Sequence, residues 1–287
     1  MELTNENYHS RENTAISNSK ANTYLKSKEL YFKRYITGEQ PFDETPSIQL
    51  GKIVDEVVEA GNLEYFKNVY HVSVKKKDDE HEFNRLKSID PSNILSPDVY
   101  SKIESICDRI FRSPFFDFYR ENDTKFQVPI RVKRSKNKKE FEICGLLDAL
   151  TIIGDTAYID DLKTTNAGSI RTPQAWAYHC NDYGYFKQMA LYRELVRIKY
   201  TQVKNIYCRH FVVSTAKSDN YPIELYTIPE NLLKGLYTEF LNVAYQITVE
   251  AEWEDNLPDW SDAIEIPDVL TLKEFEAIKN KPLKKRK

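Results

Sequence analysis

The sequence predicts an α/β fold in which one mixed β-sheet carries helices on both faces. Three observations support this fold class. The hydrophobic residues follow helical spacing at first, change to strict alternation in the middle of the chain, and then return to helical spacing. The predicted order of elements is helix, three-strand meander, helix, two strands and helix, which is typical of layered sheet-and-helix folds. The 287-residue chain is 41% hydrophobic and 13% aromatic, which is enough for a substantial core.

The first part of the chain is predicted to be mainly helical. Either Ser17 or Ser19 would cap the first helix through its hydroxyl group. A loop, "PFDETPSIQLG", separates the first two helices, and the polar residues 72–98 form a surface excursion with short helices. The predicted helices span residues 15–34, a short segment from Gly51 to Gly61, and an amphipathic segment from Pro97 that ends before Pro114.

Three strands follow as a meander. In "KFQVPIRVKR" the apolar residues alternate with more polar ones from Phe126 to Val132, which is the period of a strand. "SKNKK" is predicted to be a turn and "EFEICGLLDALTII" the second strand. Gly154 and Asp155 then form a two-residue hairpin turn of type II′, which favours glycine in the first position. "TAYIDDLKTT" is the third strand.

The last elements are a helix, two strands and a long helix. Tyr183–Tyr200 has a strong amphipathic pattern. "NIYCRHFVVS" is predicted to pair with "PIELYTI", and "ENLLKGLYTEFLNVAYQITVEAEW" is the final helix. We expect a single domain over residues 1–254, with a helical part at 15–120 and the sheet with its helices at 121–254. Residues 255–287 would be a solvated tail with the basic end "KKRK".

Charge, cysteines and motifs narrow the classes of function. A net charge of −3 gives no general affinity for nucleic acid, although a local groove can still be basic. The four cysteines form no CxxC pair, so neither a zinc site, an iron–sulfur cluster nor a disulfide framework is predicted. We expect a reducing, cytoplasmic location without a signal region or membrane-spanning segment. The sequence contains no P-loop, Rossmann fingerprint or GxSxG motif, and its five histidines show no HExxH spacing.

Three charges in the strand "YIDDLKTT" are the main functional signal. Charged side chains inside a strand are costly unless they are paired or bind a metal ion. Asp161 and Lys163 are two positions apart and share one face of the sheet, whereas Asp160 points to the other face. The two-residue turn places Asp148 directly opposite Asp161, with their Cβ atoms about 4.5–5.5 Å apart. Asp148, Asp161 and Lys163 are therefore expected to form one patch.

The chemistry of this patch depends on what lies between its two carboxylates, which repel one another unless a shared proton, a lysine or a metal ion separates them. Oxygen ligands on a rigid sheet suit Mg²⁺ or Mn²⁺, and the Leu162 backbone carbonyl could add a further ligand. Lys163 would position or deprotonate a water molecule, or stabilise charge on a phosphate. The patch thus indicates a metal-assisted phosphodiester hydrolase. The alternative is a plain ion pair of Lys163 with Asp148 or Asp161.

The run "GLLDALTIIGDTAYIDDLKTT" resembles the core of the PD-(D/E)XK nucleases. In that superfamily an Asp on one strand, an acidic-x-Lys on the next strand and a flanking helix form the active site. Asp148, Asp161 and Lys163 match those positions. The resemblance implies a restriction-endonuclease-like α/β core, a central mixed β-sheet flanked by helices, in which the two aspartates bind the metal and the lysine is catalytic.

A second motif, "YGYFKQMALY", resembles the Tyr-x-x-Gln-x-x-x-Tyr helix of the RecB-like exonuclease branch. Tyr185, Gln188 and Tyr192 match it, and the resemblance implies that these residues contact DNA and that Gln188 and Tyr192 also organise the catalytic site. The alternative is an ordinary amphipathic helix with one glutamine at its edge. Trp176 and His179 lie just before this helix and could also approach DNA.

The N-terminal segments "AISNSKANTYLKSKELYFKRYITG" and "SIQLGKIVDEVVEAG" resemble RecE-like and phage exonucleases of the YqaJ and lambda-exonuclease type. That family has a Gly-x-x-x-His helix whose histidine binds the metal, and here Asp55 holds the histidine position. Asp55 can also bind a hard cation, with Glu56 and Glu59 as nearby alternatives. The iron–sulfur members carry a cysteine near "LKSKELYF" and a C-terminal cysteine triplet, and this chain has neither.

The resemblance implies a Mg²⁺- or Mn²⁺-dependent exonuclease that hydrolyses linear double-stranded DNA in homologous recombination or DNA repair, in a bacterium or a phage-infected cell. It also implies double-stranded DNA ends as substrate, a single-strand annealing protein as partner and a ring-shaped homo-oligomer. Two other interpretations stay open. One is a structure-specific endonuclease on the same fold, and the other is a non-catalytic DNA-binding protein.

Overall fold

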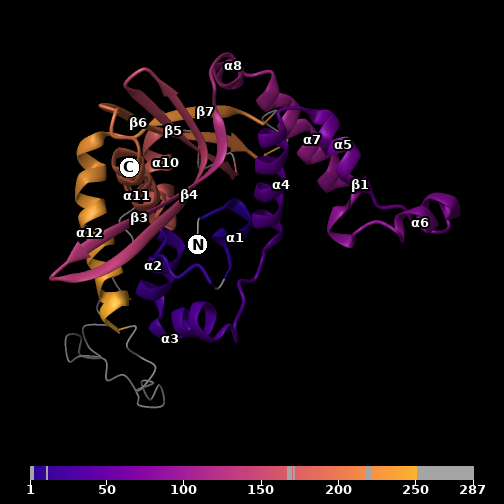
Figure 1. Ribbon diagram of the computed structural model, residues 1–287. Coiled ribbons are helices and arrows are strands. Elements are labelled where there is room, and N and C mark those ends of the chain that lie inside the picture. The colour runs from indigo at the N-terminus through magenta and orange to yellow at the C-terminus, as the bar shows by residue number, and fades with distance from the viewer. Residues whose placement is uncertain (1–2, 11, 167–169, 171, 217–220, 251–287) are drawn as a thin grey trace, which may run out of the picture. The chain divides into compact units, whose positions relative to one another are not determined.

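A five-stranded mixed β-sheet flanked by helices forms the centre of the protein in a computed structural model (Figure 1). The structure describes residues 3–250 except 11, 167–169, 171 and 217–220. This arrangement confirms the predicted fold class. The end of the last predicted helix and the tail at 255–287 lie outside the described residues. In the described part of the chain, no helix is long and apolar enough to cross a membrane.

The central sheet contains all five predicted strands. Its order is β3-β4-β5-β6-β7, and its strands are β3 (Lys125–Lys136), β4 (Lys139–Ile153), β5 (Thr156–Thr165), β6 (Asn205–Ser214) and β7 (Ile223–Thr227). The first three form an antiparallel meander, β6 joins β5 in parallel, and β7 is antiparallel to β6. The parallel step is possible because helices lie between β5 and β6 in the chain.

The turn between β4 and β5 sets the register of these two strands. Gly154 has a φ of +61°, which glycine adopts readily. Ile153 pairs with Thr156 across the turn, and the pairing continues as far as Ala149 and Asp160. The predicted two-residue turn and its register are therefore confirmed.

The helices and short elements have the following bounds: α1 (Asn5–Tyr8), α2 (Asn18–Lys26), α3 (Lys28–Tyr31), the π-helical turn η1 (Phe32–Thr37), α4 (Pro46–Ala60), α5 (Leu63–Val69), α6 (Glu80–Leu86), the 3₁₀ turn η2 (Pro91–Asn93), α7 (Pro97–Phe111), α8 (Pro114–Glu121), α10 (Pro173–Tyr183), α11 (Tyr185–Lys199) and α12 (Glu230–Glu250). Two-residue strands β1 (His71–Val72) and β2 (Ile94–Leu95) pair within the predicted surface excursion.

Several helix boundaries differ from the sequence-based prediction. Ser17 does cap α2, but the predicted helix over 15–34 is interrupted because the Ser27 hydroxyl accepts a hydrogen bond from the backbone N–H of Leu30 and starts α3. The predicted loop before Gly51 is partly wrong, since α4 already begins after its cap Thr45. Helices α8 and α10 were not predicted. Both α8 and α10 begin with proline after a Ser or Thr cap, which is a helix start signal as well as a stop signal.

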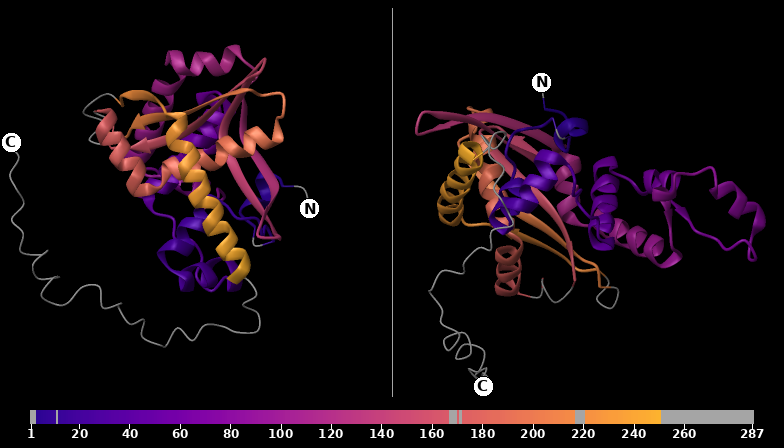
Figure 2. Two further views of the ribbon diagram at one scale, coloured as in Figure 1. Left: turned by 90° about the vertical axis from the view of Figure 1, so that its left-hand side faces the viewer. Right: turned by 90° about the horizontal axis from the view of Figure 1, so that it is seen from below.

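The helices cover the two faces of the sheet in different ways. On one face, α4, α7 and α8 bury a large apolar cluster that includes Leu162 of β5 and Phe211 of β6. On the other face, α11 lies directly on β4, because a Cβ at Gly145 would come within 2.7 Å of side-chain atoms of Tyr192 and Leu195. Helix α12 packs against α11 and α2 (Figure 2).

Candidate active site

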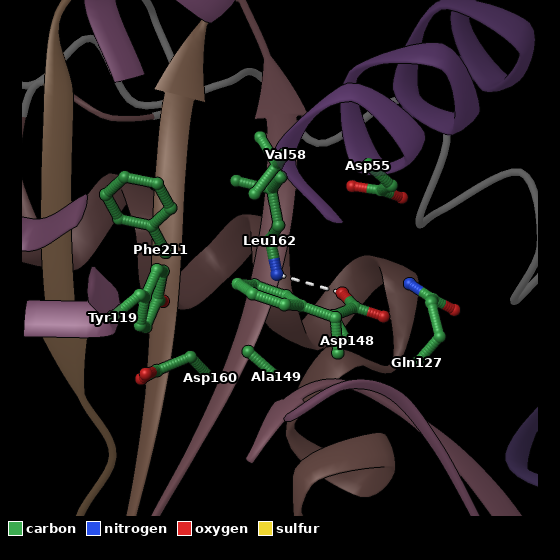
Figure 3. Close-up of a pocket in the computed structure, with 10 residues that line it drawn as sticks. Asp55, Val58, Tyr119, Gln127, Asp148, Ala149, Asp160, Leu162 and Phe211 are labelled. Atoms are coloured by element: carbon green, nitrogen blue, oxygen red, sulfur yellow. Dashed lines mark hydrogen bonds between the residues drawn. The ribbon is translucent and has the colours of Figure 1, made fainter. Parts of the chain in front are cut away.

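Asp148 lies where β4 separates from both of its neighbours. On one side, the β4–β5 pairing stops at Ala149 and Asp160, one position before Asp148 would face Asp161. On the other side, the β3–β4 pairing skips Gln127, the residue opposite Asp148. The Asp148 carboxylate replaces the missing backbone bond, since its Oδ2 accepts a hydrogen bond of 2.9 Å from the Leu162 N–H (Figure 3). This opening in the sheet gives the carboxylate a fixed direction.

Asp161 and Lys163 form an ion pair on the neighbouring strand. Lys163 Nζ lies 2.6 Å from Asp161 Oδ2, and the Asp161 side chain is completely buried. The other oxygen, Oδ1, has no hydrogen-bond partner among the described residues. Most buried carboxylate oxygens in proteins are hydrogen-bonded, so an unpartnered one marks a position where a ligand or ion is expected.

The charges in this cluster shift the pKa values of Asp148 and Lys163. Burial, followed by the charge of Asp161, raises the pKa of Asp148 to about 7, although Lys163 and the Leu162 N–H oppose the shift. Burial alone would lower the pKa of Lys163, but the carboxylates of Asp161 and Asp148 outweigh it and hold that pKa above its usual value. Lys163 is therefore a cation at neutral pH, which suits charge stabilisation better than proton abstraction.

Asp55 of α4 reaches the same cluster. Burial and the nearby charge of Asp148 raise its pKa well above the usual value, and Asp161 adds to the shift (Figure 3 shows Asp55 above Asp148). Glu56 points elsewhere, because its carboxylate accepts hydrogen bonds from the hydroxyls of Tyr65 and Tyr70. The structure thus brings Asp55 to the site. Asp55 and Asp148 also line a pocket whose lining includes Asp160 and not Asp161 or Lys163; its other lining residues are Val58, Tyr119, Phe126, Gln127, Ala149, Leu162 and Phe211.

The donor atoms of the cluster fit a hard cation. Among the described residues, no three His, Cys, Asp or Glu side chains are arranged to hold a metal ion by themselves. Mg²⁺ does not need such a cage, because it is usually bound by one or two carboxylates together with water and substrate phosphate. Asp148 and Asp161 would be these carboxylate ligands. The Leu162 carbonyl faces the same side, as Lys163 Nζ lies 3.4 Å from it.

Helix α11 brings its motif residues to this cluster. The Tyr185 ring centroid lies 5.0 Å from Lys163 Nζ, a cation–π contact. Tyr192 is buried, and its pKa is raised well above the usual value by burial first and also by Tyr8 and Asp148. Gln188 Nε2 donates a hydrogen bond of 2.8 Å to the Tyr192 hydroxyl. All three predicted positions therefore belong to one environment around Asp148 and Lys163.

His210 of β6 is a site neighbour that sequence reasoning missed. It pairs with Asp161, and its Nε2 lies 3.8 Å from Asp161 Oδ2. Trp176 Nε1 donates to its Nδ1 at 3.2 Å, so Nε2 carries the proton and faces the aspartate. Burial lowers the pKa of His210 to about 4, so the ring is neutral. Trp176 is buried in this position, so it presents little surface to a ligand.

Gln127 is a second missed residue. It lines the pocket beside Asp148, as Figure 3 shows. Its φ of +47° is in the left-handed region, which costs a residue other than glycine about 1–2 kcal/mol. No motif in the sequence points to Gln127. For His210 the signal is the parallel register of β5 and β6, which places it beside Asp161.

A mixed sheet with Asp148 on one strand and Asp161-x-Lys163 on the next defines a PD-(D/E)XK-type core. The chain belongs to a family of that class: the model of the "PDDEXK-like domain of unknown function (DUF3799)" matches residues 17–265. This membership confirms the superfamily that the sequence motifs indicated and supports nuclease activity. No protein of curated function matches the sequence.

Solved structures share the fold. The crystal structure of a "Putative exonuclease" from Eubacterium rectale aligns with 100% of this chain and 96% of its own chain, at 19% identity and a TM-score of 0.63. This likeness shows the fold alone. A second structure, SSO0001, aligns with 70% of this chain and 88% of its own chain at 13% identity, with a TM-score of 0.28, which is too low to carry an argument.

Proposed function

We propose that this protein is a Mg²⁺-dependent exonuclease that hydrolyses phosphodiester bonds from the ends of linear double-stranded DNA. The observation that carries the proposal is the cluster of Asp148, Asp161 and Lys163 at the opening between β4 and β5, inside a PDDEXK-like fold. Asp161 is buried, with one oxygen paired to the cationic Lys163 and the other unpartnered among the described residues, and this combination suits a hard cation together with a phosphate.

Each side chain has a separate task in this proposal. Asp148 and Asp161, with the Leu162 carbonyl and Asp55, would hold Mg²⁺ or Mn²⁺. When bound, the metal supplies Lewis-acid polarisation of the phosphate and lowers the pKa of a water molecule. Lys163 orients the water and stabilises the negative charge that develops on the phosphate oxygens. Tyr192, fixed by Gln188, supports the cluster from α11, and Tyr185 and Gln188 contact the DNA backbone.

The biological setting is proposed from the family resemblance. A protein from Eubacterium rectale with the same fold is named an exonuclease, which supports action from DNA ends. The role would be end resection in recombination or repair, in the cytoplasm of a bacterium or a phage-infected cell. A single-strand annealing protein would bind the exposed strand, and a ring of identical subunits would encircle the duplex.

The test uses linear duplex DNA labelled at its 5′ ends or its 3′ ends, closed circular DNA, and Mg²⁺. We expect the wild type to shorten the linear duplex and to leave the circle intact, and we expect Asp161→Ala and Lys163→Ala to be inactive. Cutting of the circle would show that the protein is an endonuclease rather than an exonuclease, and would favour the structure-specific endonuclease on the same fold. Failure to cut any substrate with Mg²⁺ or Mn²⁺ would refute the proposal and favour a non-catalytic DNA-binding protein.

A further inference from the structure

Four aromatic rings from α10 and the start of α11 contact one another in a series that begins beside Lys163 (Figure 1 labels both helices). The row begins at Tyr185, whose ring contacts Lys163 Nζ. The Tyr183 ring stacks on Tyr185 at a centroid distance of 5.7 Å, with 28° between the planes. The His179 ring lies 4.5 Å from Tyr183, and Trp176 stacks on His179 at 5.2 Å. We call Trp176, His179, Tyr183 and Tyr185 the aromatic row.

Exposure along this row is greatest at Tyr183. Tyr185 and His179, the rings on either side of it, are half-buried. Trp176, at the far end, is buried and donates a hydrogen bond to His210, which faces Asp161. Tyr183 is 62% exposed, so it presents most of its surface to solvent. An exposed tyrosine alone would carry no inference, but this one stacks on Tyr185, the ring that contacts the proposed catalytic lysine.

The row carries no positive charge at neutral pH. Burial lowers the pKa of His179, and the neighbouring Asp182 opposes the shift only in part, so the ring is neutral. Asp182 would repel a phosphate group at this position. The row therefore suits the uncharged face of a nucleobase, and Lys163 suits the phosphate.

We propose that the exposed ring of Tyr183, supported by the other rings of the aromatic row, stacks an unpaired base of the DNA strand whose phosphate lies at Lys163. The proposal rests on the nuclease function above and adds that the substrate next to the scissile bond is single-stranded. Base–aromatic stacking accepts any base, because every base has a π-face. A stacked strand advances about 3.4 Å per nucleotide, so Tyr183 lies within about three nucleotides of that phosphate. In a duplex these faces are covered by neighbouring base pairs.

The test measures DNA binding separately from cleavage. The full chain is titrated, in EDTA, into a fluorescent oligothymidylate of about 15 nucleotides, which is within the usual length of single-strand sites. An abasic oligomer of the same length carries the same phosphates without bases. The variants are Tyr183→Ala and Tyr183→Phe. Tyr207→Ala is the matched control. Tyr207 is also an exposed tyrosine that stacks on another tyrosine, Tyr158, but it lies five positions along β6 from Val212, the residue that pairs with Lys163.

We expect Tyr183→Ala to weaken binding of oligothymidylate by roughly 5- to 100-fold, the effect of losing one base–aromatic stack. Tyr183→Phe keeps the ring and should bind within about twofold of the wild type, as should Tyr207→Ala. Tyr183→Ala should leave binding of the abasic oligomer unchanged. Wild-type affinity of Tyr183→Ala for oligothymidylate, or an equal loss with the abasic oligomer, would overturn the proposal.

The cleavage assay with linear duplex and Mg²⁺ keeps the two proposals separate. Cleavage by the wild type together with binding that does not depend on Tyr183 would refute base stacking and leave the nuclease. Tyr183-dependent binding without any cleavage would refute the nuclease function and support the aromatic row as a single-strand binding surface.

Discussion

Two adjacent aspartates on β5 have opposite surroundings. Asp160, on one face of the sheet, receives two hydrogen bonds of 2.6 Å from Arg209, whose guanidinium lies over the rings of Phe118 and Tyr158. Asp161, on the other face, contacts Lys163 and, at 3.8 Å, His210 through Oδ2, whereas its Oδ1 has no partner among the described residues. Both carboxylates are buried.

This difference separates a structural ion pair from the proposed metal site. A bidentate Arg–carboxylate pair satisfies both partners and has little capacity for a further ligand. A buried carboxylate with an unpartnered oxygen is held at a cost in stability, and such a cost is typical of functional sites. In the proposed function, the same strand thus stabilises the sheet through Asp160 and binds the metal through Asp161.

The largest expected effect is on activity at Asp161. Asp161→Asn removes the charge but keeps the shape, so cleavage of linear duplex should fall by more than about 1000-fold. The melting temperature should change little, because Asp148 remains as a partner for the Lys163 charge and the repulsion between the two carboxylates is removed. Calorimetry measures the melting temperature, and a single-turnover assay measures the cleavage rate. A large loss of stability would show that Asp161 is a structural residue.

The opposite change is expected at Asp160. Asp160→Ala leaves the Arg209 guanidinium buried without its partner, and the free energy of unfolding should fall by about 3–5 kcal/mol. Replacing both residues, with Asp160→Leu and Arg209→Met, should recover much of that loss, because an apolar pair of similar size needs no counter-ion. Urea unfolding measures both. A double variant that is no more stable than Asp160→Ala would contradict this account of the pair.

A pH-dependent effect is expected at Asp148. Its pKa is about 7 in the folded protein, compared with about 3.9 in an unfolded chain. The folded state therefore binds more protons between these values, and stability falls as the pH rises from about 4 to 7. Without metal, Asp148→Asn should be increasingly more stable than the wild type across this window. Melting temperatures of both proteins test this, and a difference that does not change with pH would contradict it.

The smallest expected effect concerns the strained backbone beside the site. Gln127→Gly should raise the free energy of unfolding by up to about 1 kcal/mol, because glycine adopts a positive φ without strain. Cleavage should fall several-fold, since the amide beside Asp148 is lost. Lys138→Gly is the matched control: Lys138 has a φ of +65° in the β3–β4 turn, so the substitution should stabilise the protein without changing cleavage. Equal cleavage by the two variants would show that Gln127 does not contribute to the site.

The local parts of this structure could be predicted from the sequence. The glycine of the β4–β5 turn determines the antiparallel register, and that register alone places Asp148 beside Asp161 and Lys163. Asp160 was also expected on the opposite face, and its partner Arg209 confirms this placement. These inferences succeed because a short hairpin depends only on neighbouring residues.

Contacts between distant segments could not be predicted in the same way. His210 meets Asp161 only through the parallel pairing of β5 and β6, and no turn connects those strands to set their register. Gln127 faces Asp148 from β3, where the pairing with β4 omits this one position. The contact of Trp176 with His210 likewise depends on β6, which is distant in the sequence.

The most direct test of the central claim compares Asp160→Asn with Asp161→Asn. Both variants and the wild type would be assayed side by side on end-labelled linear duplex with Mg²⁺, at a temperature where circular dichroism shows all three folded. We predict that Asp160→Asn cleaves within a few-fold of the wild type and that Asp161→Asn does not cleave. Equal activity of the two variants, whether lost or retained, would contradict the division of structure and catalysis between these neighbouring residues.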